Sequence, residues 1–276
     1  MTINCKGKLI DLSSPAVMGI LNITPDSFYD GGKNKGERNI IKKIETMLND
    51  GATFIDIGGY SSRPGADFVS EDEELKRVLP VIKLILKQFP ETLISVDTFR
   101  SNVAKQSIES GAALINDISA GHLDNNMLTT IGKLGVPYIM MHMKGNPKTM
   151  QQHTNYNNLV KEIISYFAER LSAAYTAQLM DVIIDPGFGF AKSLEQNYEL
   201  LNRLELLNML EKPLLTGMSR KSMIYKTLNT TPDNALNGTT ALHMVALQKG
   251  AKILRVHDVK EAKECVSLYN QLNLLN

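Results

Sequence analysis

Eight apolar runs in this chain end in polar side chains, and together these residue types could bind a polar substrate. Carboxylates accept hydrogen bonds from a ligand, and amides both donate and accept them. Arginine, histidine and lysine bind anions. The runs end at, or just before, Asn22, Asp56, Asp97, Asn116, His142, Asp185, Lys221 and Arg255. Each residue alone could only open a turn or cap a helix. Their recurrence at eight run ends favours one shared site.

The apolar runs read as strands, and the segments between them read as helices. The runs are short, continuous and rich in Ile, Val and Leu, as in parallel strands buried on both faces. Ser70 with Glu73, and Ser193 with Gln196, form capping-box patterns at the starts of two helical segments. Within the first of these, we expect Pro80 to kink or split the helix. Further helices are expected after Glu37, Arg100, Asn125, Asn157, Asp233 and Asp258.

Eight strand-then-helix units predict an α/β fold, specifically a (β/α)8 TIM barrel. No linker interrupts the pattern, so residues 1–276 are expected to form a single domain. Residues 1–14 predict a short N-terminal hairpin that turns at Lys6 and Gly7. In such a barrel the carboxyl ends of the strands meet at one mouth, where the active site lies. The polar run ends should therefore converge there.

Charge and composition exclude several classes of protein. The formal net charge is +1, so nothing indicates a nucleic-acid or membrane-binding surface. No apolar run approaches the roughly 18 residues of a membrane helix, and the N-terminus has no apolar signal core. Cys5 and Cys265 lack metal-ligand spacing and are expected to be packing residues. These features predict a cytoplasmic protein that binds neither nucleic acid nor membrane.

The polar residues divide into two kinds of chemistry. Cationic donors, which suit phosphate groups, occur at Arg63, Lys221, Arg255 and His257. The loop from Gly217 leads toward a helix start, where backbone N–H groups favour anions, although it is not a P-loop. Carboxylates and an amide that could hold a planar, amine-bearing heterocycle occur at Asp97, Asn116 and Asp185.

These oxygen ligands could instead bind a metal. The sequence has neither HExxH nor a tight cluster of Asp, Glu and His, which argues against a metal cage made by protein alone. A Mg²⁺ ion held mainly by substrate phosphates would fit, with Asn22 as its single protein oxygen.

Several runs resemble the dihydropteroate synthase family, in order and across nearly the whole chain. They are MGILNITPDSFYDGG, DIGGYSSRPGA, SVDTF, INDIS, IIDPGFGF, TGMSRKS, NGTTA and RVHDV. The resemblance implies a (β/α)8 transferase of folate biosynthesis that requires Mg²⁺, is a sulfonamide target and forms a homodimer. Such an enzyme condenses 4-aminobenzoate with a 7,8-dihydropterin-6-ylmethyl diphosphate, giving dihydropteroate and diphosphate.

The resemblance also implies which residues would bind each part of the substrates. The pterin would be held by Asp97, Asn116, Asp185 and Lys221. The diphosphate and Mg²⁺ would be bound by Asn22, Arg63, Arg255 and His257, with Asn22 as the metal ligand. The residues lining the 4-aminobenzoate site would be Phe28, Ser62, Pro64 and Ser219. The catalytic residues would be Asp97, Asp185, Lys221, Arg255 and His257. The loops 24–36 and 59–70 would close over the site.

Two loops depart from the family pattern. The second commonly reads GGESTRPG, whereas here Tyr60 replaces the acidic residue and Ser62 replaces Thr. The change at Tyr60 removes a carboxylate that could pair with Arg63 inside the loop. In the first loop, Tyr29 stands where a small residue is frequent, which could alter contacts at the outer site.

Three other functions are compatible with parts of the pattern. One is a pterin-dependent methyltransferase on the same barrel, but it needs no diphosphate site and so leaves Arg63, Arg255 and His257 unexplained. Another is an aldolase that forms a Schiff base on Lys221. The last is a pterin-binding relative without catalytic activity, which is disfavoured because every expected type of diphosphate ligand is present.

Overall fold

Eight parallel strands form a closed barrel, as the sequence predicts. The computed structural model describes residues 1–23, 33–60 and 68–274. The barrel strands are β3 (Ala16–Asn22), β4 (Phe54–Gly58), β5 (Leu93–Asp97), β6 (Leu114–Asp117), β7 (Tyr138–Met141), β8 (Val182–Asp185), β9 (Leu214–Thr216) and β10 (Ala251–Val256). They lie in chain order around the barrel, and β10 closes it by pairing with β3, with Leu254 opposite Val17. All their carboxyl ends therefore open on one face.

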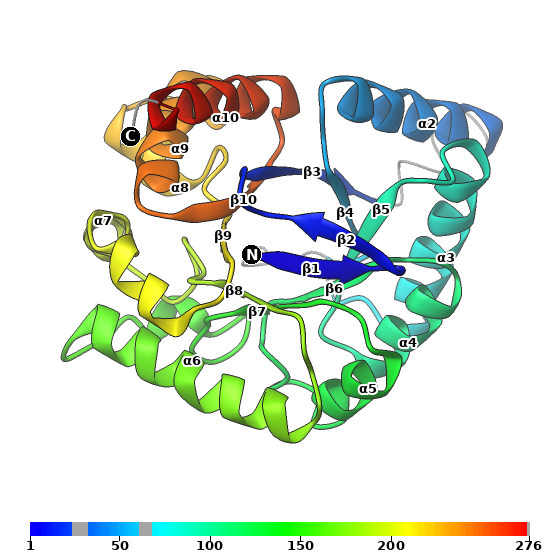
Figure 1. Cartoon of the computed structure of the whole chain (residues 1–276), viewed down its shortest axis with the longest axis horizontal. Coiled ribbons are helices and arrows are strands. Elements are labelled where there is room, and N and C mark those ends of the chain that lie inside the picture. Colours follow the sequence, from blue (N-terminus) through cyan, green and yellow to red (C-terminus); the bar gives the residue numbers. More distant parts are fainter. Residues whose placement is uncertain (24–32, 61–67, 275–276) are drawn as a thin grey trace.

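Helices surround the strands on the outside of the barrel (Figure 1). They are α2 (Lys33–Asn49), α3 (Glu71–Gln88), α4 (Ser101–Glu109), α5 (Met127–Leu134), α6 (Leu159–Thr176), α7 (Leu194–Asn202), α8 (Ser222–Thr227), α9 (Leu236–Gln248) and α10 (Val259–Asn273). Two 3-10 segments, η1 (Met150–Gln152) and η2 (Leu204–Leu210), lie in the connections. The apolar faces of the α-helices pack against the outside of the strands. The buried Ile, Leu and Val side chains between them form the main hydrophobic core.

The predicted helix starts agree with the observed caps. Ser193 and Gln196 form the reciprocal capping box at the start of α7, and the Ser70 hydroxyl accepts a hydrogen bond from the Glu73 N–H at the start of α3. However, α3 continues through Pro80 as one helix, so the predicted split does not occur. Pro80 is exposed, as is Lys76 one turn earlier. Water can therefore solvate the Lys76 carbonyl, which lacks its usual donor.

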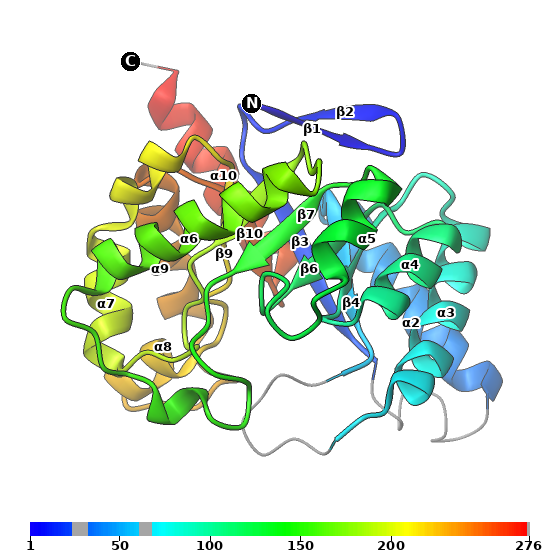
Figure 2. The ribbon, with the colours of Figure 1, turned by 90° about the horizontal axis from the view of Figure 1, so that it is seen from below.

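The predicted N-terminal hairpin is present and closes the end of the barrel opposite the mouth. It consists of β1 (Thr2–Cys5) and β2 (Lys8–Asp11), paired antiparallel around a turn at Lys6 and Gly7 that has positive φ at both residues. Figure 2 shows it at the end where β3 begins. The Asn4 N–H donates to the Asp181 carboxylate, 2.8 Å away, just before β8 starts.

The hairpin shares a core with the interior of the barrel. Ile3, Cys5 and Leu12 are buried against strand residues that include Met18 and Phe54. Cys265, on α10, is also buried, and both cysteines are free thiols, as expected for packing residues. Within the described residues, no helix has both the length and the apolar character needed to cross a membrane.

Candidate active site

A hydrogen-bonded network spans four strand ends at the barrel mouth. Arg255, on β10, donates from Nε to Asp56 Oδ2 at 2.6 Å and from Nη2 to Asp97 Oδ2 at 2.9 Å. The Asn116 amide also donates to Asp56 Oδ2, at 3.3 Å. Because β3 lies between β10 and β4, the Arg255 side chain reaches across β3 to make these contacts. Of the predicted site residues, Asp97, Asn116 and Arg255 are thus brought together.

This network has more negative than positive charge. Burial raises the pKa of Asp97 to about 7; the positive charge of Arg255 opposes this shift, and the Asp56 charge adds to it. One guanidinium therefore serves two carboxylates, of which Asp56 is fully buried and Asp97 is partly buried. Among the residues that the structure describes, no group donates to Asp56 Oδ1, which is buried. Since a buried acceptor without a donor is costly, the network suits a ligand that supplies N–H groups.

Asp185 and Lys221 form a second part of the same mouth. Asp185 Oδ1 accepts a hydrogen bond from the Gly187 N–H at 2.8 Å. Lys221 Nζ donates to the Phe188 carbonyl and lies 4.7 Å from the centre of the Phe190 ring. Burial lowers the pKa of Lys221 to about 8, against the effect of Asp185. Burial likewise raises the pKa of Asp185, and Lys221 opposes that shift.

Gly217 connects the two parts. A Cβ placed on Gly217 would lie 3.9 Å from Arg255 Cβ and 4.0 Å from both Asp185 Oδ2 and Lys221 Nζ. The three side chains therefore lie around this glycine, each in ordinary contact distance of the Cβ position. A side chain longer than that of alanine would crowd these groups.

Ser219, His257 and Asn22 lie at the outer part of the mouth. The Ser219 hydroxyl is 3.0 Å from His257 Nδ1 and accepts a hydrogen bond from the His257 N–H at 3.2 Å. His257 and Asn22 are exposed. The helix expected after Gly217 is α8, which begins at Ser222. The neighbouring Arg220 is engaged elsewhere, because its guanidinium donates to both carboxylate oxygens of Asp258.

Several predicted residues lie outside the described part of the chain. They are Phe28, Tyr29, Ser62, Arg63 and Pro64, together with most of the two predicted lid segments. Tyr60 is described, and its ring packs edge-on against Phe99 with 5.2 Å between ring centres. Arg100 lies over the same ring, 5.8 Å from its centre. The residue that replaces the family's carboxylate is therefore part of a packed aromatic and cationic group.

Three buried residues near the mouth have no specific role predicted from the sequence. Asp56 is one of the polar run ends expected at the mouth, and the structure adds its bonds to Arg255 and Asn116. His142 also follows a strand, but Lys192 has no recognisable sequence signal. Lys192 lies in the loop that follows Asp185, and its Nζ is 3.0 Å from His142 Nδ1. Asp117, although it ends β6, has both carboxylate oxygens occupied by bonds from its own loop and from Tyr138.

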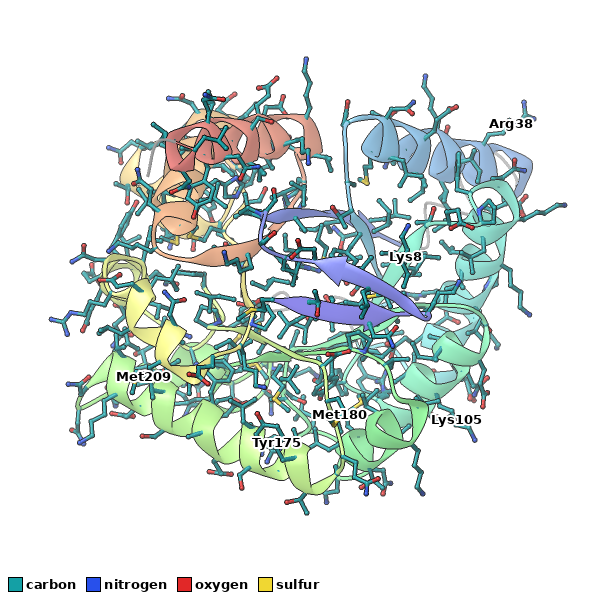
Figure 3. The ribbon with its side chains drawn as sticks, in the orientation of Figure 1. Lys8, Arg38, Lys105, Tyr175, Met180 and Met209 are labelled. Carbon is teal, nitrogen blue, oxygen red and sulfur yellow. The ribbon has the colours of Figure 1, made fainter. Side chains whose placement is uncertain are left out.

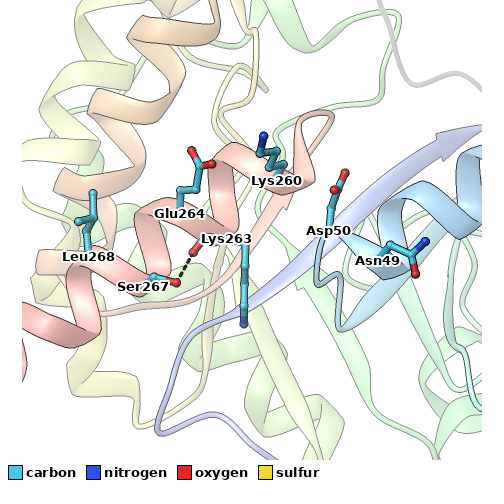
Figure 4. A pocket seen from close by; sticks show the side chains of 7 residues that line it. All are labelled: Asn49, Asp50, Lys260, Lys263, Glu264, Ser267 and Leu268. Carbon is cyan, nitrogen blue, oxygen red and sulfur yellow. Dashed lines mark hydrogen bonds between the residues drawn. The ribbon is translucent and has the colours of Figure 1, made fainter.

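A hollow on the outer surface, between α2 and α10, has a volume of about 630 Å³ (Figure 4). Its lining comprises Asn49, Asp50, Lys260, Lys263, Glu264, Ser267 and Leu268. Acidic and basic side chains are mixed there, and the Ser267 hydroxyl already donates to the Lys263 carbonyl. We therefore place the candidate site at the barrel mouth and not in this hollow.

Comparison with known proteins identifies the family. A model described as pterin binding enzyme matches residues 18–257. The dihydropteroate synthase of Escherichia coli K12 is 46% identical over 268 residues, which cover 96% of this chain and 94% of that protein. The dihydropteroate synthase of Haemophilus influenzae is 42% identical, with 98% of each chain covered. The chain belongs to the dihydropteroate synthase family of pterin-binding enzymes.

Solved dihydropteroate synthases have the same fold. The Yersinia pestis enzyme, in a complex with a sulfonamide drug, superposes with a TM-score of 0.92 at 42% identity over 100% of both chains. The Xanthomonas albilineans dihydropteroate synthase with 4-aminobenzoic acid superposes with a TM-score of 0.90 at 37% identity, covering 99% and 98% of the two chains. The closed barrel and its N-terminal hairpin are therefore those of a dihydropteroate synthase.

Proposed function

We propose that this chain is a transferase that condenses (7,8-dihydropterin-6-yl)methyl diphosphate with 4-aminobenzoate to give 7,8-dihydropteroate and diphosphate. The observation that carries the proposal is the convergence of Arg255, Asp185 and Lys221 around Gly217 at the barrel mouth, in a chain of this family. We take residues 1–276 as one pterin-binding domain that includes the hairpin 1–14. Its product belongs to folate biosynthesis.

The pterin ring fits the inner part of the mouth. Its amine-bearing edge offers N–H donors, and Asp97, Asn116 and Asp185 offer oxygen acceptors. A hydrogen bond to a charged group contributes about 1.5 to 3 kcal/mol, which is enough to orient the ring. Lys221, which already donates to the Phe188 carbonyl, supplies a cationic donor near Asp185. We assign these four residues to pterin binding.

The diphosphate fits the outer part of the mouth. His257 and Ser219 lie together there, and the N-terminal turn of α8 follows directly at Ser222. We assign Arg255 to two tasks, since its guanidinium orients Asp56 and Asp97 while its positive charge lies at the strand ends. Arg63, with Ser62, Pro64 and Phe28 on the 4-aminobenzoate side, completes the proposed site from segments outside the described residues.

The residues present fit Mg²⁺ only if the substrate supplies most of its ligands. Among the described residues, no group of three or more Asp, Glu, His or Cys side chains could hold a metal ion. Asn22 is exposed at the end of β3 and offers one amide oxygen. We propose Asn22 as the single protein ligand. When bound, Mg²⁺ would neutralise negative charge on the diphosphate oxygens.

The reaction forms one bond and breaks one. The arylamine nitrogen of 4-aminobenzoate bonds to the exocyclic methylene carbon of the pterin, and the C–O bond to diphosphate breaks with its electron pair leaving on oxygen. The arylamine proton passes to water or diphosphate. Because the electron-rich dihydropterin can delocalise positive charge, Asp97 and Asp185 would stabilise the cationic ring, while Arg255 and His257 would stabilise the leaving group.

Turnover is the direct test. Purified protein with Mg²⁺, the pterin diphosphate and 4-aminobenzoate should produce dihydropteroate and diphosphate in equal amounts. Asp185→Asn should weaken pterin binding, whereas Asp72→Asn, on the exposed side of α3, should leave it unchanged. No product under conditions in which the Escherichia coli enzyme turns over would reject the assignment. A borohydride-trapped carbonyl adduct on Lys221 would favour an aldolase instead.

We also propose that two copies of the chain form a homodimer, on the basis of the family resemblance. We propose a cytoplasmic location because both cysteines are free thiols. Tyr175, Met180 and Met209 are exposed apolar side chains on the outer surface (Figure 3). Scattered apolar residues are normal on any protein surface, so they do not locate the interface. Light scattering after gel filtration measures the mass directly, and a value near that of one chain would contradict the dimer.

A further inference from the structure

We propose that Lys192 is a positioning residue for this reaction, which holds the loop between β8 and α7 so that Asp185 and Lys221 stay in place to bind the pterin. The inference rests on the proposed function. It assigns a task to a buried lysine whose ammonium bonds to His142, Gly187 and Phe190 and not to Asp185 or Lys221 themselves. Lys192 is only 4% exposed, although lysine is rarely buried in proteins.

The surroundings of Lys192 match an ammonium group. Its Nζ lies 3.0 Å from each of three acceptors, namely His142 Nδ1, the Gly187 carbonyl and the Phe190 carbonyl. An ammonium has three N–H donors, so each donor has one acceptor. Burial lowers the pKa of His142 well below its usual value, and the charge of Lys192 adds to this effect. Burial also lowers the pKa of Lys192, to about 7, and the charge of Asp185 opposes this shift. When Lys192 is an ammonium, all three of its hydrogens point to acceptors, and His142 Nδ1 is one of them.

Lys192 bonds to the carbonyls of Gly187 and Phe190, and the backbone groups that contact Asp185 and Lys221 belong to the same short segment, 187–190. The Gly187 N–H donates to Asp185 Oδ1, and the Phe188 carbonyl accepts from Lys221 Nζ. The Phe190 ring faces Lys221 Nζ. A shift of this loop would thus move the partners of Asp185 and Lys221 together.

The backbone of the loop is unusual and closely packed on β7. Gly187 and Gly189 have φ values of +71° and +81°, a region that favours glycine. A Cβ on Gly187 would lie 2.2 Å from the His142 carbonyl oxygen, so the loop approaches the strand end directly. Lys192 bonds both to Gly187 in the loop and to His142 at the end of β7, and it thereby links the loop to this strand.

Lys192→Met removes the ammonium but keeps a long side chain. The Phe190 carbonyl then loses the Lys192 donor, and the Gly187 carbonyl keeps only the Phe190 N–H, 3.1 Å away. With the loop held less firmly, we expect the KM for the pterin diphosphate to rise about tenfold. The KM for 4-aminobenzoate should change less than about twofold, because the loop contacts concern the pterin residues. The matched control is Lys249→Met. Lys249 Nζ also bonds a backbone carbonyl, that of Asn202 at 2.6 Å, but it lies outside the mouth.

The control separates positioning from stability. Lys249→Met should lower the melting temperature while both KM values stay at the wild-type level. If Lys192→Met raises both KM values equally, or lowers only the melting temperature as the control does, the inference is wrong. Failure of the proposed function is distinguishable, because the unmodified protein would then form no dihydropteroate.

A second pair of variants covers the case in which Lys192→Met does not fold. His142→Asn keeps an acceptor near the Nδ1 position and should retain a near-normal KM for the pterin diphosphate. His142→Leu removes the acceptor and should raise this KM at least threefold, without a comparable change for 4-aminobenzoate. Equal KM values in the two variants would overturn the inference.

Discussion

At the scale of single residues, the barrel mouth is defined by an imbalance between acceptors and donors. Arg255 is the shared donor to Asp56 and Asp97, and Asp56 also accepts from Asn116. Two carboxylates thus share one guanidinium, and one oxygen of the buried Asp56 has no donor among the described residues. A ligand that presents amine and ring N–H groups would complete the pairing, whereas an acidic ligand would be repelled here. The diphosphate must therefore lie farther out.

Asp97 gives this imbalance a pH dependence. With its pKa at about 7, Asp97 takes up a proton as the pH falls through neutrality and then loses one acceptor. We expect the affinity for a pterin without diphosphate to fall below about pH 7 in the unmodified protein. Asp97→Asn should bind more weakly at pH 8 and show a smaller acid limb, because Asp185, whose pKa is also raised by burial, still titrates. Calorimetric titrations at several pH values measure this, and an acid limb in Asp97→Asn as large as that of the unmodified protein would contradict it.

The sequence predicts such residues well but not their partners. Asp97, Asn116 and Asp185 follow apolar runs, and parallel strands bring their carboxyl ends together. The contacts of Arg255 with Asp56 and Asp97 depend on a long side chain that reaches across β3, and no local pattern specifies that direction. Lys192 lies in a loop with no periodicity, so its burial appears only when the loop packs on β7.

At the scale of elements, α9 contains a histidine in an unfavourable environment. His243 is 1% exposed, and within the described part of the chain neither of its ring nitrogens has a hydrogen-bond partner. Burial lowers its pKa from 6.5 to about 4. The folded state therefore resists protonation of this ring, while the unfolded chain does not.

This histidine should make the protein sensitive to acid. Between pH 6.5 and 4 the unfolded state binds the proton first, so the free energy of unfolding should fall by up to about 3 kcal/mol as the pH decreases. His142 contributes with the same sign, so the comparison requires a variant. His243→Leu should be less sensitive than the unmodified protein in urea titrations at pH 7 and pH 4.5. An identical loss of stability in both proteins would exclude His243 as a cause.

Some elements follow directly from sequence, and others follow from packing. The capping residues Ser70 and Ser193 were sufficient to place α3 and α7, because their side chains bond the first turn locally. The predicted split at Pro80 does not occur, because the exposed Lys76 carbonyl, which loses its donor, can be solvated by water. The short segments η2 and α8 carry no periodic pattern of their own. Their conformations depend on the barrel against which they pack.

At the scale of the whole molecule, the barrel is closed at one end and open at the other. The hairpin and the interior side chains form one core at the closed end. The Asn270 amide donates to the Ser14 hydroxyl, so the end of α10 is tied to the segment after the hairpin. The two ends of the chain thus stabilise the face opposite the mouth. Stability and substrate binding are therefore separated in space.

Leu12→Ala tests this separation. Leu12 is fully buried, and removing a buried leucine side chain costs about 2 to 5 kcal/mol of unfolding free energy. Both KM values should stay unchanged, because the cavity lies at the closed end. The control is Leu9→Ala in the same hairpin, where the side chain is 69% exposed and the expected cost is below about 0.5 kcal/mol. A changed KM in the folded Leu12 variant would show that the two ends are coupled.

The burial of both cysteines has a practical consequence for spectroscopy. Cys5 is 0% and Cys265 5% exposed, and burial raises the pKa of Cys5 to about 12. Maleimide dyes react with exposed thiolates, so the native chain offers them no accessible target among its two thiols. A cysteine introduced at the exposed Lys260 would be labelled alone, without first removing the native thiols. Fluorescence from that single dye could then follow substrate binding in real time.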